Sequence, residues 1–172
     1  MAIRPILIHP DPRLKKTCLP VATVDRTVRQ LMEDMLETMY AAPGIGLAAP
    51  QVGVLKRVLV MDCSDKEGPP EPIRMVNPEV TWSSEEENLH EEGCLSIPDT
   101  YAEVTRPSAV RVRWTDERGE RQEEQFEGLY ATCVQHEIDH LNGRLFIDYL
   151  GAVKRGLITT KMRKLKKARA TA

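Results

Sequence analysis

The sequence predicts an α+β fold, because strand-like segments are grouped between helical segments instead of alternating with them. A segment with helical spacing of apolar residues comes first, short β-rich segments with hairpin turns follow, and two further helical segments complete the chain. We expect the 172 residues to form a single domain, residues 1–172, with a hydrophobic core of its own.

The first helix is predicted to begin after Asp25, whose carboxylate can accept hydrogen bonds from the first turn. Apolar residues then recur at helical spacing, and the methionines among them are most simply core packing. Residues 42–44 (Ala-Pro-Gly) end the helix, and residues 44–51 are predicted to form a loop of small residues. The apolar stripe consists of Val28, Leu31, Met32, Met35, Leu36 and Met39.

The middle of the chain contains the predicted strands. Between residues 110 and 115, valine and tryptophan alternate with arginine and threonine, which indicates a strand with one solvent-exposed face. Residues 117–120 are predicted to form a hairpin turn, and residues 68–70 (Gly-Pro-Pro) separate two earlier strand regions. The predicted strands are residues 57–61, 74–76, 80–82, 110–115 and 121–126.

Two helices are predicted after the strands. The pattern of residues 129–141 is helical, and Asn142 with Gly143 is a natural stop. The last helix spans about residues 153–169 and contains basic residues with no acid among them, although the net charge of the chain is −2. Its basic residues are Lys154, Arg155, Lys161, Arg163, Lys164, Lys166, Lys167 and Arg169.

The composition excludes several classes of function. A net charge of −2 gives the average surface no affinity for DNA, and no stretch approaches the roughly 20 apolar residues that span a bilayer. The apolar run at the N-terminus is interrupted by Arg4, Pro5 and His9, which makes it a poor signal peptide. We therefore expect a cytoplasmic protein with no membrane partner and no DNA partner. The four cysteines are expected to be thiols or metal ligands rather than disulfides.

The strongest functional signal is the His-Glu-x-x-His pattern of residues 136–140. In a helix, residues four positions apart lie on one face about 5.4 Å apart, so the imidazoles of His136 and His140 can bind one ion. Glu137 lies beside the first histidine, within reach of the open coordination position, where a carboxylate can act as general base and acid. The pattern predicts a mononuclear metallohydrolase.

A third protein ligand distinguishes the candidate chemistries. Zinc endopeptidases with this motif take theirs downstream, from a glutamate or a third histidine, and neither occurs after His140. Cys133 lies one turn before His136, but three ligands in line on one straight helix span about 10 Å and cannot share an ion. Gly93 gives the backbone the freedom to bring Cys94 close. The upstream candidates are Cys18, Cys63, Cys94, Cys133, His9 and His90.

Three segments together resemble the motifs of the peptide deformylase family. Residues 44–51 resemble the first motif, Gly-x-Gly-x-Ala-Ala-x-Gln, and residues 92–96 resemble the second, Glu-Gly-Cys-x-Ser. Residues 135–143 resemble the third, Gln-His-Glu-x-Asp-His-x-x-Gly, and the order and rough spacing also fit. The resemblance implies antiparallel β-sheets packed around a central metal-binding helix, with an N-terminal helix and a C-terminal helix.

The implied activity is removal of the formyl group from the N-terminal formylmethionine of new polypeptides. Cys94, His136 and His140 would bind one divalent ion, with water at the fourth position. The usual ion of the family is Fe2+, for which Zn2+, Ni2+ or Co2+ can substitute. Two imidazoles and a thiolate suit zinc as well as iron.

The implied mechanism assigns a role to each remaining catalytic residue. The ion lowers the pKa of its water, Glu137 takes the proton, and hydroxide attacks the formyl carbon. The Gln51 side-chain amide and the Leu95 backbone N–H stabilise the resulting oxyanion. Glu137 then delivers its proton to the departing amine.

The resemblance also implies a pocket for the methionine side chain. The helical spacing of Leu129, Cys133 and His136 supports a shared face, although plain core packing would give the same pattern. Two glycines would let the substrate backbone approach closely and would exclude acyl groups larger than formyl. The implied substrate-binding residues are Gly44, Ile45, Gly46, Leu129 and Cys133, with the stem of His136.

Two interpretations of the basic helix at residues 153–169 stay open. By resemblance, it contacts ribosomal RNA near the exit tunnel, where nascent formylated polypeptides emerge, and such binding would weaken steeply with salt. Alternatively, it is a solvated helix whose lysines favour the C-terminal end of the helix dipole.

Two competing functions also follow from the motif. A zinc endopeptidase would need the downstream ligand that this chain lacks. A non-catalytic RNA-binding module with a structural metal would need four protein ligands and would leave Glu137 without a role.

Overall fold

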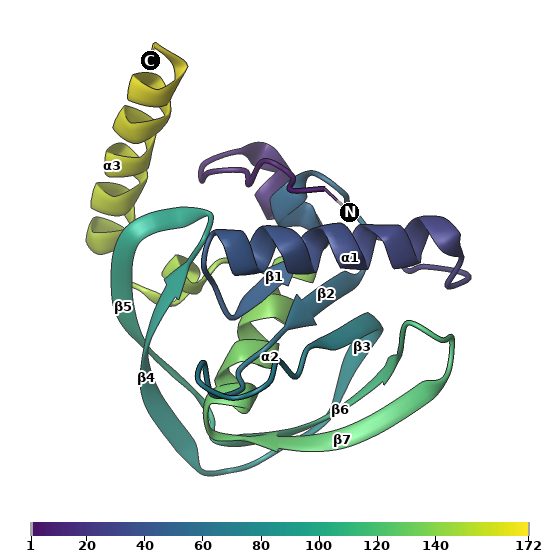
Figure 1. Ribbon diagram of the computed structural model, residues 1–172. Helices are drawn as coiled ribbons and strands as arrows, with labels where there is room; N and C mark the ends of the chain where they lie inside the picture. The colour runs from purple at the N-terminus through teal and green to yellow at the C-terminus, as the bar shows by residue number, and fades with distance from the viewer. Residues whose placement is uncertain (1, 172) are drawn as a thin grey trace.

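The computed structural model, which describes residues 2–171, has helix α2 (Gly128–Leu141) at its centre between two antiparallel sheets (Figure 1). Helix α1 (Arg26–Ala41) lies across the larger sheet, and helix α3 (Ala152–Ala170) stands at the edge of the molecule. This arrangement confirms the predicted α+β class, with antiparallel sheets around a central helix and a helix toward each end of the chain.

The larger sheet has five strands in the order β1-β2-β3-β6-β7, and β4 pairs with β5 in a separate hairpin. All of these pairings are antiparallel. The strands are β1 (Gly46–Ala48), β2 (Val58–Met61), β3 (Ile73–Ser83), β4 (Glu87–Cys94), β5 (Ile97–Pro107), β6 (Ala109–Thr115) and β7 (Arg121–Glu127). Short 3-10 helices span Pro12–Lys15, Ala49–Val52 and Phe146–Tyr149.

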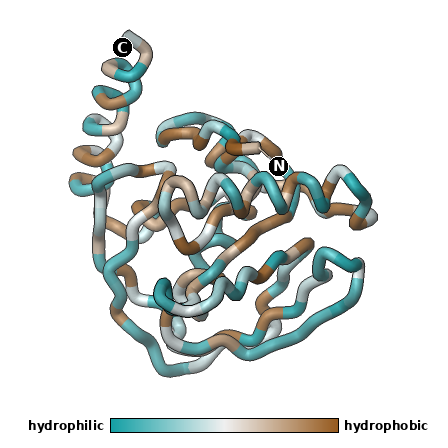
Figure 2. The backbone as a smooth tube through the Cα atoms, in the orientation of Figure 1, coloured by the Kyte–Doolittle hydropathy of each residue, from teal (hydrophilic) through white to brown (hydrophobic). Residues whose placement is uncertain are grey.

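Helix α1 forms where its periodicity predicts it. Asp25 Oδ1 accepts a hydrogen bond from the Val28 N–H at 2.9 Å, which satisfies a donor that the first turn leaves free. The apolar stripe packs against Leu47 and Val58 of the sheet. Figure 2 shows hydrophilic and hydrophobic residues alternating along α1, as an amphipathic helix requires.

The strand predictions were less accurate than the helix predictions. Residues 44–51 were expected to be a loop, but they contain β1 and a 3-10 turn, because Leu47 and Ala48 are fully buried and pair with β2. The two strands expected at residues 74–76 and 80–82 are one strand, β3, whose pairing with β6 shifts register at two places.

Hairpin β4–β5 was not predicted. Strand β4 reads Glu-Asn-Leu-His-Glu-Glu-Gly-Cys, which has no apolar alternation. Strand β5 does alternate between buried and exposed residues, but its buried positions include Thr100 and Arg106 as well as Val104. Cys94 therefore lies at the end of a strand, where the sequence indicated a loop.

Three clusters of buried apolar residues hold the elements together. One lies between α2 and the five-stranded sheet, a second lies between α1 and β1–β2, and a third joins the hairpin to α3. Met162 of α3 is fully buried in the third cluster, so the basic helix is anchored to the body. Among residues 2–171, no helix combines the length and the apolar character that a bilayer-spanning segment requires.

The turn between β6 and β7 depends on one carboxylate. Asp116 accepts hydrogen bonds from the backbone N–H groups of Arg118 and Glu120 and from the side chains of Arg118 and Gln122. Burial alone would raise the pKa of Asp116, but these donors outweigh it and lower the pKa to about 2.

We predict that Asp116→Asn lowers the free energy of unfolding by about 1–2 kcal/mol at neutral pH. Because the pKa of the folded state lies below the ordinary 3.8, this stabilisation is present above about pH 4 and is lost as the pH falls toward 2. Urea unfolding of both proteins at neutral pH and near pH 3 measures the difference. Glu117→Gln removes a charge from the same turn without these hydrogen bonds and is the control. A difference that does not shrink at the lower pH would contradict the prediction.

Candidate metal centre

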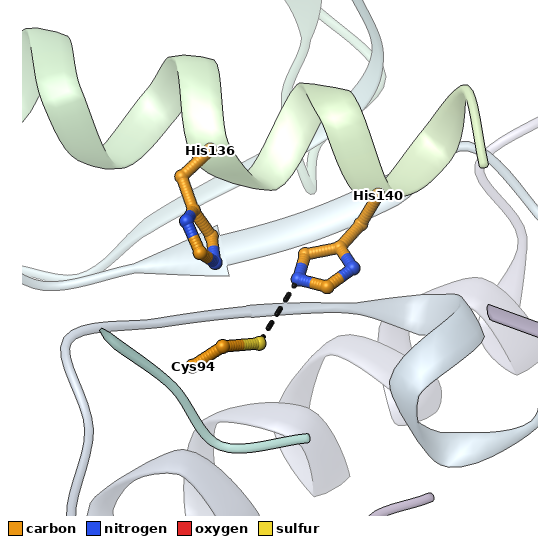
Figure 3. Close-up of side chains that lie close together, drawn as sticks. All are labelled: Cys94, His136 and His140. Atoms are coloured by element: carbon orange, nitrogen blue, oxygen red, sulfur yellow. Dashed lines mark hydrogen bonds between the residues drawn. The ribbon is translucent and has the colours of Figure 1, made fainter. Parts of the chain in front are cut away.

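The sulfur of Cys94 and the imidazoles of His136 and His140 converge between hairpin β4–β5 and helix α2 (Figure 3). One ligand atom from each residue lies within 4.8 Å of the other two, and Cys94 Sγ is 3.3 Å from His140 Nε2. Of the six upstream candidates for a third ligand, the structure brings Cys94 to the histidines. Within the described part of the chain, this is the only such group of three or more histidine, cysteine or acidic side chains.

Helix α2 places its two histidines one turn apart on the same face. Their ring centroids are 5.0 Å apart, and both side chains are buried. The ring of Phe146 stacks on His136 with a centroid distance of 6.0 Å, which restricts the rotation of the imidazole. Two imidazole nitrogens and a thiol sulfur form a donor set that suits zinc or a transition metal.

A buried carboxylate fixes the orientation of His136. Glu92 Oε1 lies 2.9 Å from His136 Nδ1, and because a carboxylate can only accept, Nδ1 carries the hydrogen. This arrangement leaves the Nε2 lone pair free for an ion. Burial alone would raise the pKa of Glu92, but the hydrogen bonds from His136 and Arg106 outweigh it and lower the pKa.

Arg106 extends this contact into a network that reaches the surface. It donates to both carboxylate oxygens of Glu92, at 2.6 and 3.0 Å, and to Asp139 Oδ2 at 2.8 Å. The Tyr149 hydroxyl donates to the same oxygen of Asp139 at 2.8 Å, and the Arg106 guanidinium lies over the Tyr149 ring. Sequence analysis gave none of these residues a role. Glu92 and Asp139 lay inside the recognised motifs, whereas Arg106 gave no signal.

Glu137 lies beside the cluster in a buried position. It is 4% exposed, and its Oε1 has no hydrogen-bond partner among residues 2–171. Gly46 faces its other oxygen so closely that a Cβ at Gly46 would lie 2.5 Å from Glu137 Oε2. Burial raises the pKa of Glu137 to about 7, against the opposing charge of His136. Such a carboxyl group can both accept and release a proton near neutral pH.

Gln51 is fixed at both ends of its amide. Its Oε1 accepts from the Ala48 N–H at 2.9 Å, and its Nε2 donates to Ser96 Oγ at 3.1 Å. Nε2 also lies 3.6 Å from Cys94 Sγ, so the donor side of the amide faces the cluster. Leu95 directly follows Cys94 and packs against Gly44, where a Cβ would lie 2.8 Å from Leu95 Cδ1.

A cavity of about 950 Å³ opens beside these groups. Every residue that sequence analysis assigned to the site lines it except His140, which is fully buried. Ile45 and Leu129 are partly exposed in its wall, whereas Cys133 is buried and its thiol donates to the Ile45 carbonyl at 3.7 Å. Tyr101 and Thr132 also line the cavity, and no sequence pattern marked them. His90, a candidate third ligand in the sequence, lines the cavity as well but does not belong to the convergent group.

The polypeptide deformylase family model matches residues 3–156 of the chain. A peptide deformylase from Rhizobium meliloti (strain 1021) is 53% identical over 169 residues, which cover 98% of this chain and 97% of that protein. A peptide deformylase from Rhizorhabdus wittichii is 54% identical over 177 residues, which cover 100% of both chains.

Solved structures agree with these relatives. A peptide deformylase from Legionella pneumophila superposes with a TM-score of 0.91 at 47% identity, over 99% of each chain. The enzyme from Ehrlichia chaffeensis superposes with a TM-score of 0.93 at 36% identity, over 98% of this chain and 99% of that one. The matched family model, the relatives and the solved structures confirm the resemblance carried by the three motifs: the chain belongs to the peptide deformylase family of metal-dependent enzymes that act on N-formylmethionyl peptides.

Proposed function

We propose that this chain removes the formyl group of nascent N-formylmethionyl polypeptides with a divalent ion held by Cys94, His136 and His140. We also propose that residues 1–172 act as one catalytic domain. The observation that carries the proposal is the buried Glu137, with a free carboxyl oxygen, beside three convergent ligand atoms at an open cavity.

The donor set fits one divalent ion. His136 has Nδ1 engaged by Glu92, which leaves Nε2 to bind, and His140 Nε2 already faces the Cys94 sulfur. By family resemblance the ion is Fe2+, and Zn2+, Ni2+ or Co2+ would suit the same donors. When bound, the ion supplies the Lewis acidity that makes a water molecule nucleophilic near neutral pH.

Glu137 serves as the proton carrier in this proposal. Its free Oε1 accepts a proton from the attacking water, which adds to the formyl carbon. The same carboxyl group then delivers the proton to the nitrogen of the formylated methionine. The bond between that nitrogen and the formyl carbon breaks, and formate leaves. Because the group is buried, the transferred proton is shielded from exchange with bulk water.

When water adds to the formyl carbon, an oxyanion forms on the formyl oxygen, and neutral donors stabilise it. Gln51 Nε2 faces Cys94, and the backbone N–H of Leu95 follows Cys94 directly in the chain. A side-chain amide and a backbone N–H donate without bringing a charge that would compete for the ion. Ser96 and Ala48 hold the Gln51 amide in place before substrate arrives.

Substrate choice is proposed to depend on the cavity walls. Ile45, Leu129 and Cys133 supply an apolar surface for the methionine side chain. Gly44 and Gly46 leave no space for a side chain, as the close approaches of Leu95 and Glu137 show. We propose that the two glycines let the substrate backbone approach closely, so that acyl groups larger than formyl would clash.

The basic helix α3 is proposed to contact ribosomal RNA. Met162 anchors one face of the helix, and Lys161 Nζ donates to the Asp99 carbonyl at 3.0 Å. The remaining cations are mostly exposed, and they include Lys164 and Lys167. The alternative is that α3 is a solvated helix without a partner, and the ribosome-binding experiment below distinguishes the two.

We predict that Glu137→Gln lowers kcat for formyl-Met-Ala-Ser by about 10²–10⁴-fold, because the amide cannot carry the proton. Elemental analysis should show unchanged metal content, since Glu137 is not one of the three ligands. Glu124→Gln, on the exposed face of β7, is the matched control and should keep normal turnover. Normal turnover by Glu137→Gln would exclude the proposed role of Glu137. Cleavage of internal peptide bonds by the unmodified chain would favour an endopeptidase.

We predict that Cys94→Ala loses its bound metal while Cys133→Ala retains it. The two substitutions each remove one thiol near the histidines, but only the Cys94 sulfur belongs to the convergent group. Elemental analysis after anaerobic purification, with circular dichroism to verify folding, measures the outcome. Equal metal content in the two folded variants would disprove the assignment of Cys94.

We predict that the double substitution Lys164→Gln and Lys167→Gln weakens ribosome binding and leaves turnover of a short formyl peptide unchanged. Each lost phosphate contact should reduce the steepness of the plot of log K against log salt concentration by about 1. Arg111→Gln with Arg113→Gln removes the same charge from strand β6 and is the control. Equal ribosome affinity in both double variants would favour the solvated helix.

A further inference from the structure

Tyr101 is an aromatic residue that stays exposed at the rim of the cavity beside the candidate metal centre. It is 66% exposed, whereas its neighbours on β5, Thr100 and Ala102, are buried. Together with Gly93 and Cys94 it lines the cavity of about 950 Å³. A single exposed aromatic side chain is common on protein surfaces, so its surroundings decide whether it has a role.

The ring of Tyr101 is held against the backbone of β4. Gly93 lies directly opposite Tyr101 in the hairpin, and a Cβ at Gly93 would lie 2.6 Å from Tyr101 Cε1 and 2.7 Å from Tyr101 Cδ1. The ring therefore covers Gly93 and takes the space that a side chain there would need. Because Gly93 directly precedes Cys94, this contact places the ring close to the proposed metal ligand. A side chain that is already fixed loses little conformational entropy when a ligand packs on it.

The walls of the cavity determine which substrate residue reaches Tyr101. Figure 3 shows the two histidines of α2 on one side of the candidate metal centre and Cys94 on the other. The proposed methionine pocket includes Leu129 and Cys133 of α2. Successive side chains of an extended peptide point to opposite sides. When the methionine side chain points toward α2, the side chain of the next residue points toward the hairpin, where Tyr101 is exposed.

We propose that Tyr101 is a specificity-determining residue that favours an aromatic side chain directly after the formylmethionine. Aromatic rings attract each other in offset-stacked and edge-to-face arrangements, in addition to the apolar area that they bury. Gly93 covers only part of the Tyr101 ring, and the exposed remainder is available for such a contact. This inference rests on the proposed deformylase function and adds to it a preference for one class of polypeptide.

A purely structural role for Tyr101 makes a different prediction. An aromatic side chain that covers a glycine on the neighbouring strand can stabilise the hairpin, and such packing would support the turnover of every substrate equally. A contact with the second residue of the substrate would instead discriminate between substrates. The discrimination should appear in KM rather than in kcat, because Tyr101 has no contact with the formyl carbon in the proposed mechanism.

The experiment measures kcat and KM of the metal-loaded full chain for formyl-Met-Phe-Ser, formyl-Met-Ala-Phe and formyl-Met-Ala-Ser. We expect kcat/KM to be about tenfold higher for formyl-Met-Phe-Ser than for formyl-Met-Ala-Ser, through a lower KM. Formyl-Met-Ala-Phe should show no such advantage. Tyr101→Ala should abolish the preference, and Tyr101→Phe should keep it because the ring remains. Circular dichroism verifies folding, and Tyr101→Leu, which keeps an apolar cover on Gly93, replaces Tyr101→Ala if that variant does not fold.

Leu89→Ala is the matched control, because Leu89 is exposed on the same hairpin but does not line the cavity, and this variant should keep the preference. Three outcomes would each overturn the inference: no preference in the unmodified chain, a preference that persists without the ring, or an equal loss of kcat/KM for all three peptides in the ring-less variant. Failure of the proposed function is distinguishable from these outcomes, because the unmodified chain would then turn over none of the formylated peptides.

Discussion

The rest of the site depends on the hydrogen bonds that the buried carboxylate of Glu92 accepts. It belongs to β4, yet it contacts His136 on α2 and Arg106 on β5, so it joins the hairpin to the central helix. Burying an ion pair has a desolvation cost that only well-placed hydrogen bonds offset, and Arg106 provides them by also donating to Asp139. Loss of one partner would leave a buried charge unpaired, at a cost of about 3–5 kcal/mol. Cys94 follows Glu92 closely on the same strand, so this contact also positions the thiol.

A second constraint is the close packing around Glu137. Burial makes the carboxyl group less acidic, and Gly46 permits that burial because no side chain stands between the strand and the helix. Gln51 lies on the turn that follows the same strand, held by the Ala48 N–H. The first motif therefore supplies the proposed oxyanion donor and the space for the proposed proton carrier from one short segment. This explains physically why small residues and a glutamine occur together there.

Helix α2 and its two histidines could be predicted from sequence, because helical spacing is local and places residues 136 and 140 on one face. The approach of Cys94 could not be derived in that way. Six upstream residues were candidates. Helix geometry argued against Cys133, and only the family resemblance selected among the other five. Hairpin β4–β5 was missed because buried threonine and arginine replace the expected apolar residues of β5. Arg106 could be recognised only once its two acceptors, Glu92 on β4 and Asp139 on α2, were seen around it, since long-range pairing leaves no local pattern.

The order of these elements along the chain has a consequence for biosynthesis. Gln51, Cys94 and Glu137 come from successive thirds of the polypeptide, and α2 is made near its end. The contacts between them span long stretches of sequence, so their formation must wait until most of the chain has left the ribosome. A copy that is interrupted before residue 140 lacks one of the three proposed ligands and cannot complete the proposed centre, however well its earlier strands fold. Synthesis through helix α2 is thus a precondition for the proposed chemistry in this architecture.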